Sequence, residues 1–246
     1  MPATPAWPPK SLPRLYVRAP LAAGAGVELD SAQANYLGNV MRKGAGDELL
    51  VFDGRSGEWL ACIAEAGKKR MRLKVERQTR DAEALPDLTL AFAPVKRAQT
   101  DWLVEKATEL GVCRLQPVMT QRTIAERVRL ERMESIAIEA AEQCGRTLIP
   151  EIAEPLSLLQ FLERRVAAVP LYFADESGGA EAAAVLKPGP AIVLIGPEGG
   201  FTNEEREAVR SAKGAVAISL GPRILRAETA ALAAVTAYMA LAGDWR

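Results

Sequence analysis

The sequence contains no histidine among its 246 residues. Histidine is the commonest general base and a frequent metal ligand, so its absence excludes every Ser-His and Cys-His catalytic pair. The three cysteines, Cys62, Cys113 and Cys144, are odd in number and far apart, which gives neither a metal-ligand spacing nor a disulfide framework. We therefore expect no metal site and a reducing, cytoplasmic location.

Long apolar runs are also missing. The longest weakly charged stretch, residues 229–243, is too short and too alanine-rich to span a bilayer. Residues 1–13 contain five prolines and lack the apolar segment of a signal peptide. We expect a soluble protein with no membrane partner, preceded by a disordered proline-rich tail over residues 1–13.

The formal net charge is zero, but the charges are unevenly distributed. Residues 1–80 hold 13 Lys/Arg against 8 Asp/Glu, a net charge of +5. A basic first third favours a polyanionic partner, although a solvated surface explains the same charge equally well. Charge alone therefore leaves both interpretations open.

Residues 14–78 predict a small β-barrel, because short strand-like segments alternate there with glycine-containing turns. One helical stretch, residues 30–42, interrupts the strands. In the last strand the basic side chains of Arg70, Arg72 and Lys74 alternate with apolar ones and therefore share one face. Such a row suits a phosphate backbone, although an ordinary solvated strand face has the same pattern.

Residues 79–87 are polar, contain a proline and precede a change of pattern, which predicts a domain linker. Over residues 88–246, apolar runs without strong alternation are separated by helical segments, which is typical of an α/β domain with a parallel sheet covered on both faces. Ligands of such domains lie beyond the carboxyl ends of the strands. We therefore expect the loops that follow residues 174, 195 and 220 to meet in one functional site.

The loop at residues 196–200, Gly-Pro-Glu-Gly-Gly, lacks the lysine of a nucleotide-binding P-loop and the spacing of a dinucleotide fingerprint. Its glycines allow the backbone to approach a flat ligand closely. Glu198 opposes a polyanion and is compatible with a cationic or amine-bearing ligand. The alternative is a plain turn between a strand and a helix.

Two motifs carry a resemblance to a known family. "IGPEGGFTNEE" (195–205), followed by "SLGPRILRAETAALAA" (219–234), closely resembles the SPOUT class of RNA methyltransferases, and within it the family of ribosomal RNA small subunit methyltransferase E. The stretches at 35–54, 104–112 and 139–146 also look like that family, so the resemblance covers nearly the whole chain after the tail.

The resemblance implies a PUA-like N-terminal barrel (14–78) that binds RNA and a C-terminal SPOUT domain (88–246) with a deep trefoil knot. It also implies a homodimer that takes S-adenosylmethionine as methyl donor and methylates N3 of a uridine, uridine 1498 in the family, in the 16S rRNA of the assembled 30S subunit. The residues that match the family's donor site are Leu171, Tyr172, Ile195, Gly196, Pro197, Glu198, Gly199, Gly200, Leu220, Gly221, Ile224, Leu225, Arg226 and Thr229.

Methylation at N3 requires loss of the imide proton and stabilisation of the charge on the two neighbouring oxygens. We hypothesise that Arg226 or Arg122 stabilises this charge, that Glu228 or Glu142 orients or accepts the proton, and that Arg146 acts across a dimer. The expected RNA contacts are Arg14, Arg18, Arg42, Arg70, Arg72, Lys74, Lys96 and Arg97.

Two departures from the family pattern concern RNA contacts, because Tyr36 and Thr123 stand where the family often has histidine and cysteine. Two other functions stay open. One is a non-catalytic RNA-binding or ribosome-assembly factor, and the other is a methyltransferase that acts on a different RNA.

Overall fold

The computed structural model describes residues 12–67, 70–125 and 127–245. The predicted tail lies outside these residues except for its last two. The chain forms two compact units, of which the first comprises the described residues up to Glu83 together with Glu142–Leu148. The second comprises Ala84–Ala141 and the chain from Ile149 onwards.

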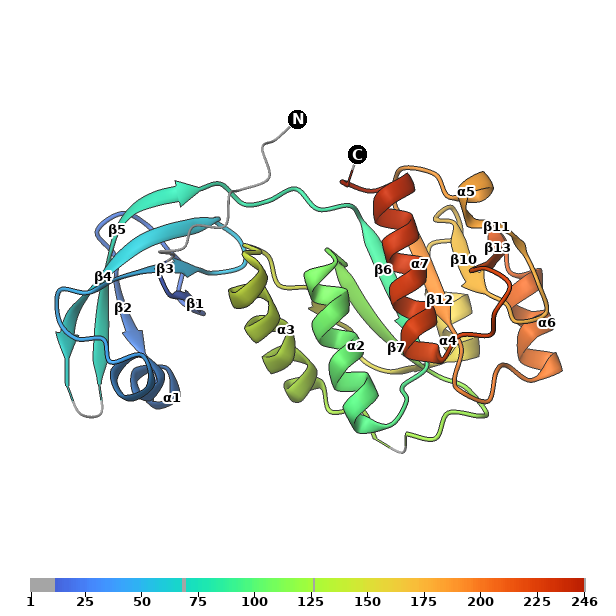
Figure 1. The fold of residues 1–246 in the computed structure, drawn as a ribbon, viewed down its shortest axis with the longest axis horizontal. Helices are drawn as coiled ribbons and strands as arrows, with labels where there is room; N and C mark the ends of the chain where they lie inside the picture. The colour runs from blue at the N-terminus through green and yellow to red at the C-terminus, as the bar shows by residue number, and fades with distance from the viewer. Residues whose placement is uncertain (1–11, 68–69, 126, 246) are drawn as a thin grey trace. The chain divides into compact units, whose positions relative to one another are not determined.

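The first unit is built on a five-stranded sheet with the order β1-β3-β4-β5-β2 (Figure 1). Its elements are β1 (Arg14–Tyr16), β2 (Gly26–Leu29), α1 (Ser31–Asn35), the π-helix η1 (Tyr36–Val40), β3 (Glu48–Phe52), β4 (Glu58–Ala66) and β5 (Met71–Arg80). All pairings are antiparallel except β1 with β3. Alternate side chains of β5, such as Met71, Leu73 and Val75, are buried, and one core fills the unit.

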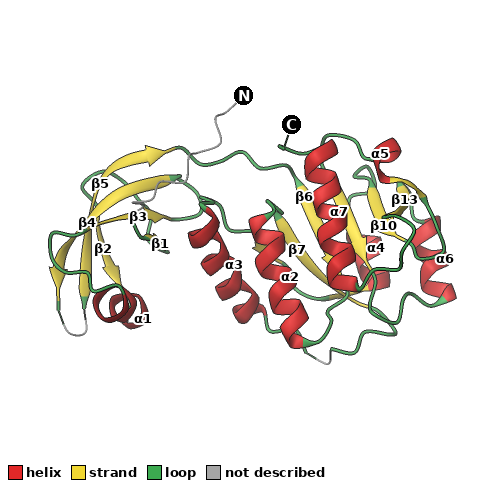
Figure 2. Cartoon of the chain, in the orientation of Figure 1, coloured by secondary structure: helices red, strands yellow, loops and turns green. Residues whose placement is uncertain are grey.

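The second unit contains a parallel sheet with the order β11-β13-β10-β12-β6-β7-β8, and β9 pairs with β7. Its strands are β6 (Leu88–Phe92), β7 (Arg114–Met119), β8 (Glu151–Ile152), β9 (Leu156–Ser157), β10 (Leu171–Ala174), β11 (Ala180–Glu181), β12 (Ala191–Ile195) and β13 (Ala215–Ser219). Its helices are α2 (Arg97–Glu109), α3 (Leu130–Cys144), α4 (Leu158–Arg164), α5 (Ala182–Val185), α6 (Asn203–Ser211) and α7 (Ala227–Leu241), and the last turn of α3 belongs to the first unit. Figure 2 shows the alternation of strands and helices.

Both faces of this sheet are buried, which explains why its strands are apolar throughout. In β12, Ala191, Val193 and Ile195 pack into the core shared with α2 and α7, whereas Ile192 and Leu194 pack into the core shared with α4 and α6. A parallel sheet covered by helices on both faces has this pattern. The α/β fold class predicted from the sequence is confirmed, and the knot stays a prediction.

Candidate functional site

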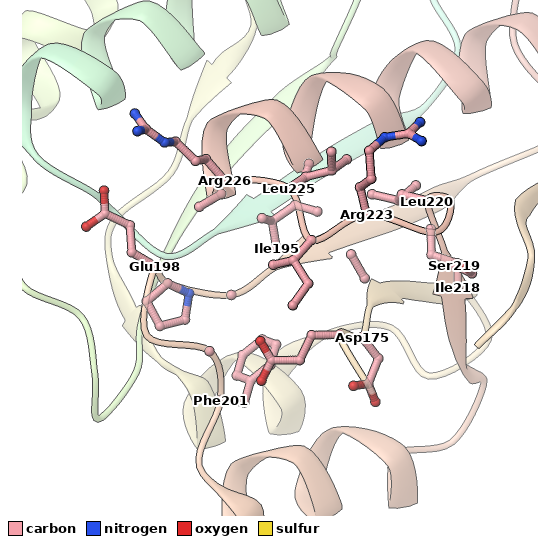
Figure 3. Close-up of a pocket in the computed structure, with 18 of the residues that line it drawn as sticks. Asp175, Ile195, Glu198, Phe201, Ile218, Ser219, Leu220, Arg223, Leu225 and Arg226 are labelled. Carbon is pink, nitrogen blue, oxygen red and sulfur yellow. The ribbon is translucent and has the colours of Figure 1, made fainter. Parts of the chain in front are cut away.

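A cavity of about 660 Å³ lies at the carboxyl ends of β10, β12 and β13. Its walls come from the three loops that follow these strands and from the start of α7. Figure 3 shows Glu198 and Arg226 on one side of the cavity and Arg223 on the other. The volume lies within the range of small-molecule sites, which is about 300–1,000 Å³. The meeting of the three loops, expected from the topology, is therefore observed.

Most residues of the predicted donor site line this cavity. They are Ile195, Gly196, Pro197, Glu198, Gly200, Leu220, Gly221, Ile224, Leu225 and Arg226. Ile195, Leu220 and Leu225 supply apolar surface, which suits the flat face of a nucleobase. Lys96, predicted from the sequence as an RNA contact, is also part of the lining.

Four residues of the predicted donor site are not part of the lining. Leu171 and Tyr172 begin β10 rather than ending it, and both are buried, with the Tyr172 hydroxyl donating to the carbonyl of Val185 at 3.2 Å. The residues that follow along this strand, Ala174 and Asp175, reach the cavity instead. Gly199 and Thr229 are exposed outside it.

Two glycines of the 196–200 loop have no room for a side chain. A Cβ atom on Gly196 would lie 2.9 Å from Cε2 of Phe201, whose ring is buried beneath the loop. Gly200 has a φ of +68°, in the left-handed region, and a Cβ atom there would lie 2.7 Å from a carboxylate oxygen of Glu176. Gly196 is therefore required for close packing against Phe201, and Gly200 is required for its left-handed φ.

The loop after β10 is organised around Asp175, whose side chain is only 1% exposed. This carboxylate accepts hydrogen bonds from the backbone and hydroxyl of Ser177, at 2.9 and 2.7 Å, and from Arg210 at 2.7 Å. Burial alone would raise the pKa of Asp175, but the bonds from Ser177 and Arg210 outweigh it, so that the pKa lies below its ordinary value. The charged carboxylate therefore stabilises the loop.

A second ion pair joins the same loop to α6. Arg206 donates to Glu176 at 2.8 Å, and its Nε lies 3.5 Å from Asp175. All three side chains line the cavity. The sequence indicated this loop as a whole, but it gave no signal for the individual residues, because their partners lie about 30 positions further along the chain.

The predicted catalytic residues divide between the two units. Arg226 lines the cavity, and Glu228 stands in the first turn of α7 with a buried Oε2 atom that has no hydrogen bond to the described residues. Arg122 donates to the carbonyl of Gly199 at 2.7 Å, although it is 77 positions away in the sequence. These three residues belong to the second unit.

Glu142 and Arg146 belong instead to the first unit, and both contact residues of β1. The Glu142 carboxylate accepts the backbone N–H of Tyr16 at 2.8 Å, and Arg14 donates to the carbonyls of Glu142 and Arg146 at 2.9 and 2.7 Å. Arg14 also pairs with Glu58 at 2.8 Å and is only 11% exposed. These contacts lie inside the first unit, and the catalytic roles of Glu142 and Arg146 and the RNA contact of Arg14 stay predictions.

The other predicted RNA contacts are exposed side chains. On β5, Arg72 and Lys74 alternate with the buried residues, as the two-residue period predicts, and Arg70 is exposed just before the strand. Arg18 and Arg42 are exposed elsewhere in the first unit, and Arg97 begins α2. Arg42 has a φ of +56°, an uncommon conformation for a residue other than glycine.

Among the described residues, no helix has both the length and the apolar character needed to cross a membrane. Within the same residues, no cluster of three or more Cys, Asp or Glu side chains is arranged to hold a metal ion.

Two family models match the chain. The RNA methyltransferase domain matches residues 83–239, and the RNA methyltransferase PUA domain matches residues 29–76. The fold and the two matches thus define the class, an RNA methyltransferase with an N-terminal PUA domain.

Relatives identify the family within this class. Ribosomal RNA small subunit methyltransferase E of Rickettsia conorii is 33% identical over 90% of this chain and 93% of that protein, and its counterpart from Synechocystis is 35% identical over 93% of this chain and 77% of that protein. The crystal structure of the Neisseria gonorrhoeae counterpart, bound to S-adenosyl methionine, superposes with a TM-score of 0.89 at 29% identity and covers 96% of this chain and 100% of that one. The chain belongs to the family of ribosomal RNA small subunit methyltransferase E.

Proposed function

We propose that this protein transfers the methyl group of S-adenosylmethionine to N3 of a uridine in 16S rRNA within the assembled 30S subunit. The observation that carries the proposal is the cavity between residues 195–201 and 218–227, because it has the size, the apolar surface and the glycine-lined wall that a nucleoside needs. The donor bound to the Neisseria relative supports the same ligand. The family's uridine 1498 is the proposed target.

The residues of the cavity fit this donor. The glycine loop offers backbone groups at close range, since neither Gly196 nor Gly200 has room for a side chain. Ile195, Leu220 and Leu225 would pack against the adenine ring, and Glu198 would attract the positively charged part of the donor. When bound, the donor supplies a methyl group that is already activated on a sulfonium ion.

The protein must then orient the uridine and stabilise the charge that develops as the imide proton leaves. Arg226, at the cavity wall, would donate hydrogen bonds to a uridine oxygen. Glu228, two residues further on in the first turn of α7, is the residue that would accept or orient the proton, and it would reach the uridine from outside the present cavity lining. Because N3 is hidden in base pairs, the target uridine must be unpaired or turned out of its helix.

RNA would also contact the exposed basic face of β5, where Arg72 and Lys74 lie. We further propose that the protein acts in the cytoplasm as a homodimer.

Methylation of purified particles tests the proposal. Small subunits, naked 16S rRNA and transfer RNA from a strain that lacks this enzyme would each be incubated with the protein and isotopically labelled donor, and their nucleosides analysed by mass spectrometry. The expected product is labelled 3-methyluridine in 16S rRNA, formed on 30S particles and not on naked RNA. Labelled transfer RNA would show a different substrate, and RNA binding without any product would show a non-catalytic assembly factor.

A pair of arginine variants tests the assigned role within the same assay. Arg226→Ala should lower the single-turnover rate with saturating donor by about 100-fold, the loss typical of one charge-stabilising donor. Arg164→Ala is the matched control, because Arg164 is an exposed arginine in the last turn of α4 that does not line the cavity, and this variant should keep the rate. A full rate for Arg226→Ala would remove Arg226 from the mechanism.

A further inference from the structure

Three helices of the protein, α1, α4 and α6, begin with the same capping arrangement. In each, a side chain in the first turn accepts a hydrogen bond from the backbone N–H of the capping residue. In α1 and α4 this side chain is a glutamine, Gln33 or Gln160, and the distances are 3.3 and 3.2 Å. In α6 it is Glu205, which accepts from Thr202 at 3.0 Å.

Each of these side chains has a second terminal nitrogen or oxygen atom that takes no part in the cap. The contact of that atom explains why the residue is glutamine in α1 and glutamate in α6. Gln33 uses its Nε2 to donate to the carbonyl of Tyr16 at 2.8 Å. Glu205 uses its second oxygen, Oε1, to accept the backbone N–H of Gln121 at 2.7 Å. An amide has one accepting end and one donating end, whereas a carboxylate accepts at both. Only a carboxylate can therefore serve Thr202 and Gln121 together.

Glu205 is well placed to hold this second contact. It is only 8% exposed, and hydrogen bonds to a charged acceptor are the stronger ones. Gln121 lies in a short turn after β7 that is closed by a hydrogen bond from the N–H of Thr123 to the carbonyl of Thr120 at 3.1 Å. The turn 120–123 is therefore ordered by its own hydrogen bonds and joined to α6 by the half-buried bond from Gln121 to Glu205.

The same turn carries Arg122. Its guanidinium donates to the carbonyl of Gly199 at 2.7 Å, and the neighbours of Gly199, Glu198 and Gly200, line the cavity. The turn is thus attached to the segment 199–205 at two points, through Arg122 at one end and Glu205 at the other. If the bond to Glu205 were lost, the turn would keep its internal hydrogen bonds and the Arg122–Gly199 contact, but it would lose the contact described here with the first turn of α6.

We propose that Glu205 is a positioning residue for methyl transfer: it fixes the turn 120–123 against α6 and so keeps Arg122 at the glycine loop. The proposal rests on the function proposed above and on the hypothesis, made from the sequence, that Arg122 stabilises the charge of the reacting uridine. Glu205 itself touches neither donor nor uridine and acts through Arg122.

Glu205→Gln tests the attachment without using activity. The amide keeps one accepting oxygen, but its NH2 group would face the second backbone N–H, so one of the two bonds is lost. Trypsin cleaves after arginine, and cleavage after Arg122, located by mass spectrometry under native conditions, should accelerate about tenfold. Gln160→Ala is the matched control, because it removes only the capping contact of α4 and should leave cleavage after Arg122 unchanged. Unchanged cleavage in Glu205→Gln would overturn the proposal.

A double-mutant cycle tests the consequence for the reaction. Glu205→Gln and Arg122→Ala should each lower the single-turnover rate with saturating donor, and their combination should be no slower than Arg122→Ala alone, since both act through one side chain. Rates that multiply in the double variant, or a full rate for Glu205→Gln, would contradict a positioning role. If Glu205→Gln does not fold, Glu205→Asp replaces it, because the shorter carboxylate keeps the charge but not the reach to Gln121.

Trypsin cleavage and the single-turnover rates together distinguish a failure of the positioning role from a failure of the proposed function. A wild-type protein that methylates no RNA would refute the proposed function, while trypsin cleavage would still decide whether Glu205 holds the turn. An active wild type with fast cleavage and a full rate in Glu205→Gln would leave the function standing and refute the positioning role.

Discussion

Substituting alanine for Gly196 should weaken donor binding through a single steric contact. The added Cβ atom would lie 2.9 Å from Cε2 of Phe201 and 3.2 Å from two further ring atoms, all closer than an ordinary contact. The ring is 5% exposed and packed in the core, so it cannot turn away freely. The glycine loop or the ring must then shift into the cavity that both of them line.

The size of the effect follows from the cost of overpacking, which is about 1–3 kcal/mol for an extra methyl group in a well-packed core. If most of this cost falls on the donor-bound geometry of the loop, donor affinity should fall about tenfold, since tenfold corresponds to about 1.4 kcal/mol. Isothermal titration with S-adenosylmethionine at a temperature where both proteins are folded measures the change.

A rescue variant distinguishes this contact from general damage. Phe201→Leu removes ring atoms that the new methyl group would meet, so the double variant should bind the donor more tightly than Gly196→Ala alone. Gly44→Ala is the control, because nothing lies within 4 Å of a Cβ atom there. Wild-type affinity in Gly196→Ala, or no recovery in the double variant, would refute the steric argument.

Three further changes test other parts of the structure. The pKa of Asp175 is lowered in the folded protein, so its charged form adds stability above the unfolded pKa of about 3.9, and this stability is lost as the pH falls through the folded pKa. Asp175→Asn should therefore make the free energy of unfolding depend less on pH in this acid range, as followed by circular dichroism. An unchanged pH dependence would contradict this. Glu58→Ala should destabilise the first unit by about 3 kcal/mol, because it removes a nearly buried carboxylate that pairs with both Arg14 and Arg80, and denaturant unfolding that matches wild type would argue against this. Arg72→Ala should lower the slope of log RNA affinity against log salt concentration by about one. Lys187→Ala, an exposed control in the second unit, should keep the wild-type slope. A wild-type slope in Arg72→Ala would exclude the β5 face from RNA binding.

Much of the fold follows from local patterns in the sequence. The apolar runs became the parallel strands, and Gly111 and Gly145, which follow α2 and α3, both take the left-handed φ expected of glycines that end helices. The helical stretch 30–42 was predicted as one helix but divides into α1 and the π-helix η1. In η1, a Cβ atom added to Gly38 would lie 3.7 Å from Cε of Met71, so this turn lies close to a distant strand, which local periodicity does not show.

The loops of the candidate site could be predicted from the sequence. Which residues of the neighbouring strands reach the cavity could not. The glycine loop and the loop at 220–226 were found because their composition is unusual and because carboxyl ends of parallel strands meet. Leu171 and Tyr172 came from the family resemblance alone, and they begin β10, whereas Ala174 and Asp175 at its far end line the cavity. Asp175 and Glu205 were missed because their partners come from other elements of the fold.

We propose that the loops after β10, β12 and β13 together hold the methyl donor, and a crystal structure of this protein grown with S-adenosylhomocysteine would show whether they do. We expect the adenine between Ile195 and Leu225, with the backbone of residues 196–200 along one side of the ligand and Arg226 within reach of the sulfur end. Ligand density outside this cavity, or none at a concentration that saturates binding in solution, would show that these loops do not hold the donor.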